Sequence, residues 1–212
     1  MDLSDRHVVV TGGAGALGSA VVPALRERGA IVHAPAIEEI DLADEASVER
    51  YYAALPALWG SVHLVGGFVM KPIAETRLAD LDHMLSLNTR TCFLTCREAV
   101  KAMRRSGGGG RIVNVIARPV LAPVGGLVAY AASKAAVASI TQSLAAELRD
   151  EDIWVNAVAP SLIDTPANRA SMPDADHAKW PKPDDLAREI CALVSPANRL
   201  VSGALIPLYG HA

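Results

Sequence analysis

A tyrosine and a lysine, Tyr130 and Lys134, stand four residues apart in an alanine-rich stretch of the sequence. On a helix, residues at this spacing lie on the same face, one turn from each other. A phenol normally holds its proton until about pH 10, and a neighbouring ammonium group lowers that pKa by stabilising the phenolate. The pair therefore has the chemistry of a general acid or base near neutral pH, although an ordinary amphipathic helix can carry the same spacing.

A glycine-rich turn near the start of the chain offers a second kind of chemistry and reads Thr11-Gly12-Gly13-Ala14-Gly15-Ala16-Leu17-Gly18. It follows an apolar, β-branched run and opens a helical pattern, and Gly13, Gly15 and Gly18 fit the GxGxxG fingerprint of dinucleotide-binding turns. Glycines there let the backbone approach a pyrophosphate, whose charge is stabilised by N–H groups at the helix N-terminus. The alternative, a plain glycine-rich connection, is disfavoured by the position of the turn between an apolar run and a helix.

The elements that must position these two motifs alternate along the chain. Short apolar runs predict strands, and longer runs with helical spacing predict helices, one of which Asp44 caps. Such alternation builds βαβ units and a parallel sheet, with ligands outside the carboxyl ends of the strands. We therefore predict a single α/β domain over residues 1–212, a Rossmann-type doubly wound parallel sheet, with 164–182 as a substrate loop or lid. The predicted strands are 7–10, 30–34, 39–42, 62–65, 111–116, 153–158 and 204–208, and the predicted helices are 17–28, 44–58, 78–105, 129–149 and 184–193.

The composition argues against several other classes of protein. The 212-residue chain is 51% hydrophobic and 20% charged, which is a globular balance. Its net charge is −3, whereas a nucleic-acid-binding protein normally carries a basic excess. No apolar run approaches the about 20 residues that cross a bilayer, and the acidic start carries no secretory signal. We therefore expect a cytoplasmic protein with a small-molecule substrate and with no nucleic-acid or membrane partner.

The cysteines and histidines do not form a recognisable metal motif. Cys92 and Cys96 stand four residues apart on a predicted helix, Cys191 is far along the chain, and the six histidines are scattered. A zinc site needs more ligands close together in the sequence than this pattern offers. We therefore interpret the cysteines as buried thiols in a reducing compartment and predict no metal.

Several segments, taken in order, make this chain resemble the classical short-chain dehydrogenase/reductase family over nearly its whole length. The turn at 11–18 resembles the family's TGxxxGxG motif, with Ala16 in place of the middle glycine. Tyr130 and Lys134 match the catalytic pair, and Asn88 matches the helix asparagine of the catalytic tetrad. The other matches are Asp41-Leu42, similar to the acidic pair that contacts adenine; Gly66-Gly67, at the family's Asn-Ala-Gly turn; and Pro160-Ser161-Leu162-Ile163-Asp164-Thr165, similar to the PGxxxT segment.

This resemblance implies an NAD(P)(H)-dependent oxidoreductase that transfers a hydride between nicotinamide and a carbonyl, an alcohol or a related small molecule. It implies that Lys134 binds the nicotinamide ribose and lowers the pKa of Tyr130, which exchanges a proton with the substrate oxygen. Asn88 would support a water in the proton relay, and Pro160, Ile163 and Thr165 would hold the nicotinamide end of the cofactor. The family also builds dimers and tetramers from long helices, so the resemblance implies a homo-oligomer, either tetramer or dimer.

The sequence leaves the choice between NAD and NADP open. An acidic residue at the end of the second strand usually selects NAD through the ribose hydroxyls, but this chain reads His33-Ala34-Pro35-Ala36 there. Glu38 and Glu39 come slightly later in the chain. No basic residue lies at this position to bind the 2′-phosphate of NADP, so the sequence favours NAD slightly.

One position departs from the family pattern. The family's catalytic serine would stand thirteen residues before the tyrosine, where this chain has Ala117, which cannot donate a hydrogen bond to a developing oxyanion. Loss of one such donor typically costs about 10²–10³ in rate. Ser133 points to a different helix face from Tyr130, so we do not expect it to replace the missing donor.

Two alternatives therefore stay open beside a carbonyl reductase. The first is reduction of an iminium-like or quinonoid acceptor, as in dihydropteridine reductase-like members, which resemble this chain at 12–18 and lack the serine. The second is a catalytically impaired nucleotide-binding module, which the retention of Asn88, Tyr130 and Lys134 disfavours. Turnover of NADH or NADPH with carbonyls and quinonoid pterins separates these readings, because a module would bind cofactor without any turnover.

Overall fold

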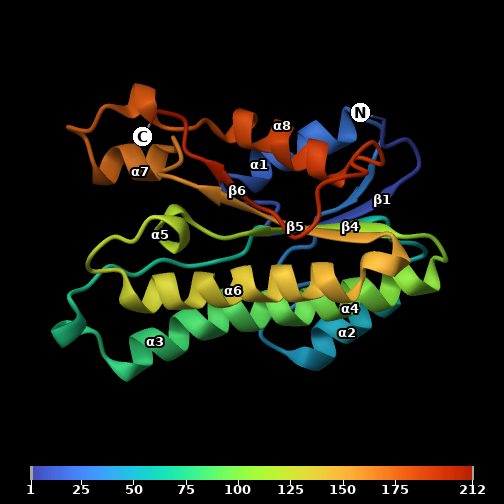
Figure 1. Ribbon diagram of the computed structural model, residues 1–212, viewed down its shortest axis with the longest axis horizontal. Helices are drawn as coiled ribbons and strands as arrows, with labels where there is room; N and C mark the ends of the chain where they lie inside the picture. The colour runs from blue at the N-terminus through green and yellow to red at the C-terminus, as the bar shows by residue number, and fades with distance from the viewer. Residues whose placement is uncertain (1, 212) are drawn as a thin grey trace.

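Six parallel strands form the middle layer of the computed structural model, which describes residues 2–211 (Figure 1): β1 (His7–Thr11), β2 (Ile31–His33), β3 (Gly60–His63), β4 (Gly110–Val115), β5 (Ile153–Pro160) and β6 (Leu205–Leu208). Their order in the sheet is β2-β1-β3-β4-β5-β6, and every neighbouring pair is parallel. The order reverses at β1, which pairs with β2 on one side and β3 on the other. This reversal is the switch point of a doubly wound sheet, so the predicted fold class is confirmed.

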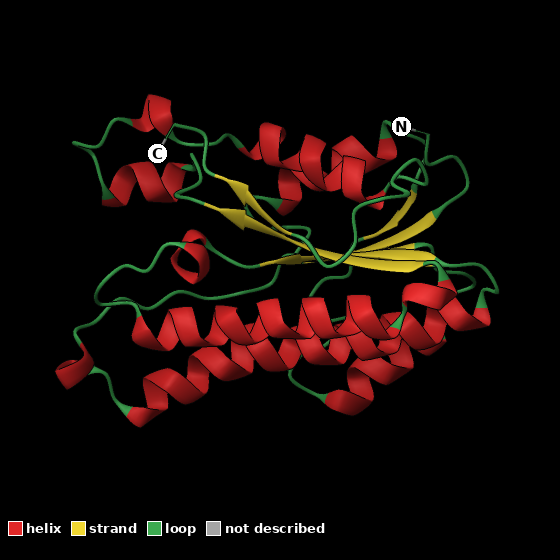
Figure 2. Cartoon of the chain, in the orientation of Figure 1, coloured by secondary structure: helices red, strands yellow, loops and turns green. Residues whose placement is uncertain are grey.

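Helices cover both faces of the sheet (Figure 2): α1 (Gly18–Arg26), α2 (Glu45–Ala53), α3 (Leu78–Met84), α4 (Thr91–Arg105), α5 (Arg118–Leu121), α6 (Val128–Glu147), α7 (Pro166–Ser171) and α8 (Pro183–Val194). α1 and α8 pack together on one face, and α2, α4 and α6 lie on the other. Each face buries its own apolar cluster, so the strands are apolar on both sides, as crossover helices require. Within residues 2–211, no helix combines the length and apolar character needed to span a membrane.

The start of α2 confirms the predicted cap, whereas its end differs from the prediction. The carboxylate of Asp44 accepts hydrogen bonds from the backbone N–H groups of Ala46 and Ser47, at 3.2 and 3.1 Å. The helix ends at Ala53, before the predicted end at residue 58. Pro56 explains the early end, because proline disfavours helical geometry at the residue before it and cannot donate a backbone hydrogen bond.

The predicted strand at 39–42 is wrong. These residues lie outside the sheet, and the chain turns at 37–39 before it enters α2. Only residues 34–38 separate this stretch from β2, whereas a parallel strand pair needs a crossover of about a dozen residues or more. β2 is therefore an edge strand, and the stretch becomes a loop that is free to line a site.

The predicted helix at 78–105 consists of α3, a π-helical segment at Leu85–Arg90, and α4. In a π-helix the hydrogen bonds run one residue further back than in an α-helix, and short π segments are frequent at functional sites. The segment contains Asn88, which is 1% exposed and points into the protein interior. The irregular turn thus directs the Asn88 side chain toward Gly67 in the loop after β3 and toward Ser133 on α6.

Residues 164–182, predicted as a loop or lid, contain α7 and a 3-10 turn at His177–Lys179. Trp180 is buried and its ring lies 4.6 Å from the ring of His177. The backbone N–H of Asp164 donates to the carbonyl of Pro181 at 2.9 Å, which joins the two ends of the segment. Trp180 thus packs within the segment, and the backbone N–H of His211, which donates to the carbonyl of Lys179 at 2.9 Å, links the segment to the C-terminal end.

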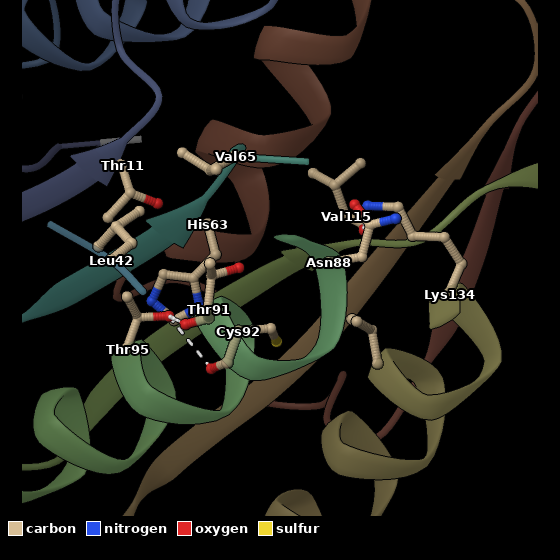
Figure 3. Close-up of a pocket in the computed structure, with 11 residues that line it drawn as sticks. Thr11, Leu42, His63, Val65, Asn88, Thr91, Cys92, Thr95, Val115 and Lys134 are labelled. Atoms are coloured by element: carbon tan, nitrogen blue, oxygen red, sulfur yellow. Dashed lines mark hydrogen bonds between the residues drawn. The ribbon is translucent and has the colours of Figure 1, made fainter. Parts of the chain in front are cut away.

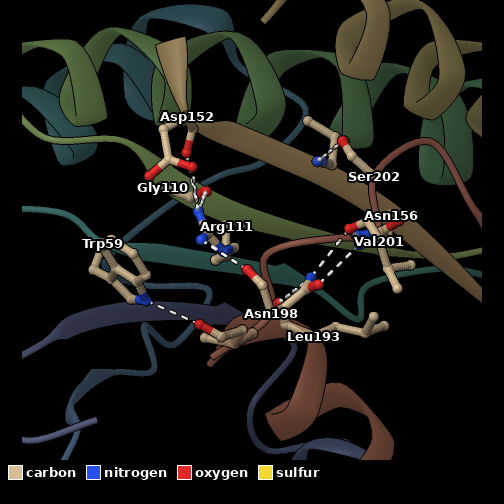
Figure 4. A network of polar contacts seen from close by, with 11 residues as sticks. Trp59, Gly110, Arg111, Asp152, Asn156, Leu193, Asn198, Val201 and Ser202 are labelled. Carbon is tan, nitrogen blue, oxygen red and sulfur yellow. Dashed lines mark hydrogen bonds and ion pairs between the residues drawn. The ribbon is translucent and has the colours of Figure 1, made fainter. Parts of the chain in front are cut away.

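A buried arginine closes the amino ends of the strands (Figure 4). Arg111, near the start of β4, donates to the carbonyls of Gly110, Asp152 and Asn198 at 2.8, 2.9 and 2.9 Å. Its guanidinium lies 4.8 Å from the ring of Trp59 and 4.9 Å from that of Trp154. Arg111 thus joins β4 to the chain before β5 and to the segment after α8, at the end of the sheet that lies opposite the switch-point loops.

Candidate active site

A cleft opens at the carboxyl ends of β1 and β3, beside the switch point of the sheet. Its volume is about 670 Å³, which lies in the range of small-molecule and cofactor sites. Five of the predicted cofactor-binding residues line it: Gly12, Gly13, Gly15, Asp41 and Leu42. The turn after β1 and the loop that replaces the predicted third strand therefore face the same space.

The glycine-rich turn has the geometry of a phosphate cradle. Gly12 has a φ of +75°, and a Cβ on Gly18 would collide with the carbonyl oxygens of Gly12 and Gly13. α1 begins at Gly18 with no side-chain cap and no acidic residue in its first turn. The positive end of the helix dipole therefore meets the cleft without a competing carboxylate, and these residues fit the pyrophosphate of a dinucleotide.

Asn88 connects three elements at the inner edge of the cleft. Its Oδ1 accepts from the backbone N–H of Gly67 at 2.8 Å, and its Nδ2 donates to Ser133 Oγ at 2.9 Å. The Ser133 hydroxyl in turn donates to the carbonyl of Tyr130 at 2.7 Å. The asparagine thus holds the Gly66-Gly67 loop against α6. Ser133 is committed to these contacts, in agreement with the prediction that it does not replace the missing donor.

Tyr130 and Lys134 lie one turn apart on α6, as predicted. Lys134 is 6% exposed, and its Nζ donates to the carbonyl of Val115 at 2.9 Å. Burial lowers the pKa of Lys134 to about 8 and raises the pKa of Tyr130 to about 12. The expected lowering of the tyrosine pKa by the lysine is therefore not observed, because burial of the phenol raises that pKa and the ammonium is directed to a backbone carbonyl.

A small cavity lies between Lys134 and the cofactor cleft (Figure 3). Its volume is about 10 Å³, close to the room that one water molecule needs. Lys134 and Asn88 line one side, and Thr11, which also lines the larger cleft, lies on another. The Oγ1 atom of Thr11 is buried and has no hydrogen-bond partner within the protein. The cavity thus contains polar groups that a bound molecule can satisfy.

The other predicted cofactor-binding residues do not line the cleft around the glycine-rich turn. Leu17 is buried in the core beneath α1, and Ala16 is exposed. Pro160 is the last residue of β5, and Ile163 and Thr165 follow it at the carboxyl end of the sheet. The Thr165 hydroxyl accepts from the backbone N–H of Asn168 at 3.2 Å and so caps α7. These positions lie toward the lid side of the sheet.

Several residues near the site escaped the sequence analysis. His83, Ser86 and Leu87 line the cleft from the helix that carries Asn88. The ring of Phe68 lies 5.0 Å from that of Tyr130 in an edge-to-face arrangement, although Phe68 is 63% exposed. Their positions depend on the π segment and on the path of the loop after β3. The proximity of Phe68 to Gly67 in the sequence was the only available signal.

A dinucleotide cradle at a sheet switch point, followed by a buried lysine one turn from a tyrosine, defines an NAD(P)-dependent oxidoreductase. A family model described as short chain dehydrogenase matches residues 36–176, which is more than half of the chain. The protein belongs to the short chain dehydrogenase family, and the family resemblance predicted from the sequence is confirmed.

Individual relatives agree with this assignment over most of the chain. A levodione reductase from Leifsonia aquatica is 30% identical over 227 residues, covering 92% of this chain and 82% of that protein. A 3-ketoacyl-(acyl-carrier-protein) reductase from Brucella melitensis, solved in complex with NADH, has a TM-score of 0.87 and 23% identity, with 99% and 98% of the two chains covered. A structure of ElxO with NADP bound has a TM-score of 0.89 and 21% identity, with 97% and 98% covered. These two structures share the fold of this protein.

Proposed function

We propose that this protein transfers a hydride between a nicotinamide cofactor and a small carbonyl compound or its alcohol, with Tyr130 as the acid or base. The observation that carries this proposal is the burial of Lys134, which is 6% exposed and lines a polar cavity with Asn88 beside the dinucleotide cleft. An ammonium group loses its hydration at such a place only at a cost in free energy. A cofactor ribose, with its hydroxyl oxygens, is a natural hydrogen-bond partner for it.

Different residues of the site would bind the cofactor and transfer the proton. Gly12, Gly13 and Gly15 would hold the pyrophosphate, and the carboxyl-end segment with Ile163 and Thr165 would hold the nicotinamide end. The bound nicotinamide supplies or accepts the hydride. Every other contribution comes from side chains of this chain, which orient the substrate and move a proton.

Tyr130 is suited to donate a proton during reduction. Burial raises the pKa of Tyr130 to about 12, so the phenol is protonated at neutral pH. In the reductive direction the Tyr130 O–H bond breaks and an O–H bond forms on the substrate oxygen. The cavity beside Lys134 and Asn88 has room for one water, through which the proton can be replaced.

Because Ala117 stands in place of the family serine, some classes of substrate are favoured over others. Ala117 is 7% exposed and follows β4, and the nearby hydroxyl of Ser133 is already engaged by Asn88 and a backbone carbonyl. A substrate oxygen would therefore receive its main hydrogen bond from Tyr130 alone. This arrangement favours acceptors that are already electrophilic. The relatives compared give no support to the pterin alternative or to a noncatalytic module.

The surroundings of Tyr130 favour an apolar substrate. Phe68 and Met70 are 63% and 61% exposed, and Val124, in the loop that approaches Met70, is 51% exposed. Lys71 N–H donates to the carbonyl of Gly126 at 2.8 Å, which brings these two loops together. Clustered exposed apolar side chains mark binding sites in soluble proteins. We therefore propose activated ketones with aromatic or aliphatic groups as the substrate class, with residues 164–182 as the loop that closes over them.

The cleft also favours NAD over NADP. Its lining residues include the acidic Glu38 and Asp41 and contain no lysine or arginine. A carboxylate near the ribose would repel a 2′-phosphate, whereas ribose hydroxyls could donate to it. Glu38→Arg is expected to improve the use of NADPH relative to NADH about tenfold, as measured by the ratio of their kcat/KM values. An unchanged ratio would remove Glu38 from cofactor selection.

The long helices favour a homo-oligomer, most simply a dimer or tetramer. Phe93 on α4 is 51% exposed, and the groove between α4 and α6 is lined by Val100, Ile140 and Leu144. Closed symmetric assemblies bury such helix faces against a second copy. Light scattering that gives the mass of a monomer at micromolar concentration would contradict this.

The decisive experiment compares wild type with Tyr130→Phe. Wild type is assayed with NADH and NADPH against apolar ketones, aldehydes and a quinonoid dihydropterin. Tyr130→Phe is expected to reduce kcat at least about 100-fold without changing cofactor affinity, because only the proton donor is lost. Tyr51→Phe, on the distant α2, is the matched control. Substantial turnover by Tyr130→Phe would overturn the assignment.

A further inference from the structure

Behind the cofactor cleft, α4 carries two cysteines that face a histidine of β3. Cys92, Cys96 and His63 are 5%, 1% and 5% exposed. Their potential ligand atoms all lie within 4.8 Å of one another. The sequence analysis found only the cysteine pair, because His63 is 29 residues away and is brought to the pair by the packing of α4 on the sheet.

Two of the three separations match the edges of a tetrahedron around a metal ion, and the third, between Cys92 Sγ and the His63 ring, is at most 4.8 Å. The two sulfur atoms lie 3.9 Å apart, and Cys96 Sγ lies 3.6 Å from His63 Nδ1. For Zn–S bonds of about 2.3 Å and Zn–N bonds of about 2.0 Å, tetrahedral geometry gives S···S of about 3.8 Å and S···N of about 3.5 Å. The three side chains therefore need little movement to bind one ion.

A fourth ligand atom is available on β4. Asn114 Oδ1 lies 2.8 Å from His63 Nδ1 and 3.5 Å from Cys96 Sγ, on the same side of the cluster. Its orientation is set by Nδ2, which donates to Thr141 Oγ1 at 2.9 Å, while that hydroxyl donates to a carbonyl. The amide oxygen is therefore fixed toward the cysteines and histidine, where it can complete the coordination.

The neighbours of His63 can hold either tautomer of its ring. His63 Nε2 lies 2.8 Å from Ser61 Oγ, which in turn lies 2.9 Å from the Tyr52 hydroxyl. The Ser61 hydroxyl can donate to a bare Nε2 or accept from a protonated one. When a metal takes Nδ1, the ring proton resides on Nε2 and is held by Ser61. Such outer contacts orient the metal-bound histidines of known sites.

We propose that Cys92, Cys96 and His63 form a binding site for a zinc-like divalent cation, with Asn114 Oδ1 as the fourth ligand. Two thiolates and an imidazole suit a borderline-soft cation and not Mg²⁺ or Ca²⁺. Both thiols release their protons on binding, and the two thiolates neutralise the charge of the ion.

The position of the site gives it a structural task. A bound ion would cross-link α4 to β3 and β4 directly beneath the cofactor cleft, since Cys92 and His63 line the small cavity shared with Lys134 (Figure 3). Binding to the folded chain alone raises thermal stability by mass action. This inference does not depend on the proposed reaction, because Cys92, Cys96, His63 and Asn114 have no assigned role in hydride or proton transfer.

The test measures metal binding by the full chain under reducing conditions. Protein from zinc-supplied culture is analysed for metal content, and metal-free protein is titrated with Zn²⁺ against a chromophoric chelator. Co²⁺ serves as a spectroscopic probe, since thiolate-to-cobalt charge transfer reports sulfur ligation. The variants are Cys92→Ser and Cys96→Ser, and Cys191→Ser, a buried thiol of α8, is the matched control. Circular dichroism of the metal-free variants checks that each is folded.

One equivalent of Zn²⁺, a thiolate–cobalt band and a metal-dependent rise in Tm are expected for wild type and for Cys191→Ser. Each of the other two variants is expected to lose the band and to weaken Zn²⁺ binding at least about 100-fold, more than an outer contact typically costs. No stoichiometric zinc in wild type from either route would overturn the proposal. Equal affinity in all variants would also overturn it.

Discussion

The amino ends and the carboxyl ends of the strands differ in how their polar groups are paired. At the amino ends, Arg111 is 2% exposed, makes three hydrogen bonds to backbone carbonyls and lies against two tryptophan rings, although its Nε has no partner. At the carboxyl ends, Lys134 has one carbonyl partner and the buried Thr11 Oγ1 has none. The first arrangement connects segments of the chain, and the second leaves polar atoms available to a ligand.

This difference separates a buried cation that stabilises the fold from one whose desolvation lowers the stability of the cofactor-free protein. A buried cation paired to several acceptors contributes to a unique structure, whereas a buried cation with few partners destabilises the fold unless a ligand compensates it. The same helix-covered sheet thus holds one buried arginine that joins segments of the chain and one buried lysine to which we assign a part in the proposed reaction. Four substitutions test this division.

The largest effect is expected at the amino end. Arg111→Met is expected to lower the free energy of unfolding by about 3 kcal/mol, because three carbonyls lose their donor and two tryptophan rings lose a cation. Urea unfolding measures this loss, and the kcat of the folded enzyme should not change. Arg188→Met, at an exposed ion pair, is the control and should change stability by less than about 0.5 kcal/mol.

Lys134→Met is expected to change stability in the opposite direction: near neutral pH, loss of the buried ammonium should raise the free energy of unfolding of the cofactor-free protein. Burial lowers the pKa of Lys134 to about 8 from 10.5 in the unfolded chain, so between these values the unfolded state binds more protons and stability rises with pH. From pH 7.5 to pH 10.5, wild type should gain up to about 3 kcal/mol relative to Lys134→Met, in urea unfolding of the cofactor-free protein. A stability difference that does not vary with pH would mean that the lysine is not desolvated.

A substitution at the loop after β3 tests the site without removing a polar group. A Cβ on Gly66 would lie 2.7 Å from Asn88 Oδ1 and 3.0 Å from Lys134 Nζ, so Gly66→Ala should displace both. We expect kcat/KM to fall about 10- to 100-fold, with a small change in Tm. Gly125→Ala meets open space and is the matched control. Equal activity of the two variants would show that this loop does not position the pair.

The smallest effect is expected from restoring a donor. Ala117→Ser should raise kcat on simple ketones up to about tenfold, because a hydroxyl there can donate to the developing oxyanion. Strongly electrophilic acceptors should gain less, since they need less polarisation. The ratio of the two rates measures the effect. A rate on ketones that is unchanged or lower would indicate that Ala117 does not occupy the position of the missing donor.

Local patterns were sufficient where an interaction lies within a few residues. The turn at 11–18, the cap at Asp44 and the pairing of Tyr130 with Lys134 each depend on neighbours along the chain, and the structure contains all three. The predicted strand at 39–42 failed because its short apolar run has no room for a crossover from β2. A pattern of residue types contains no information on how long the connection between two parallel strands must be.

Residues that meet only through packing escaped prediction. His63, Cys92 and Asn114 come from three elements, and their contacts depend on the register of β3 with β4 and on how α4 lies across them. The pKa shifts of Tyr130 and Lys134 likewise come mainly from burial, which depends on the elements packed around α6.

The sequence alone determined the class of fold, the dinucleotide turn and the family, because these follow from alternating strands and helices and from motifs of adjacent residues. Tertiary structure decided which polar groups are desolvated and which are satisfied. It also decided which loops surround Tyr130 and that a histidine meets two cysteines beneath the cleft. Desolvation and ligand geometry are properties of atoms brought together from distant parts of the chain, so no local pattern encodes them.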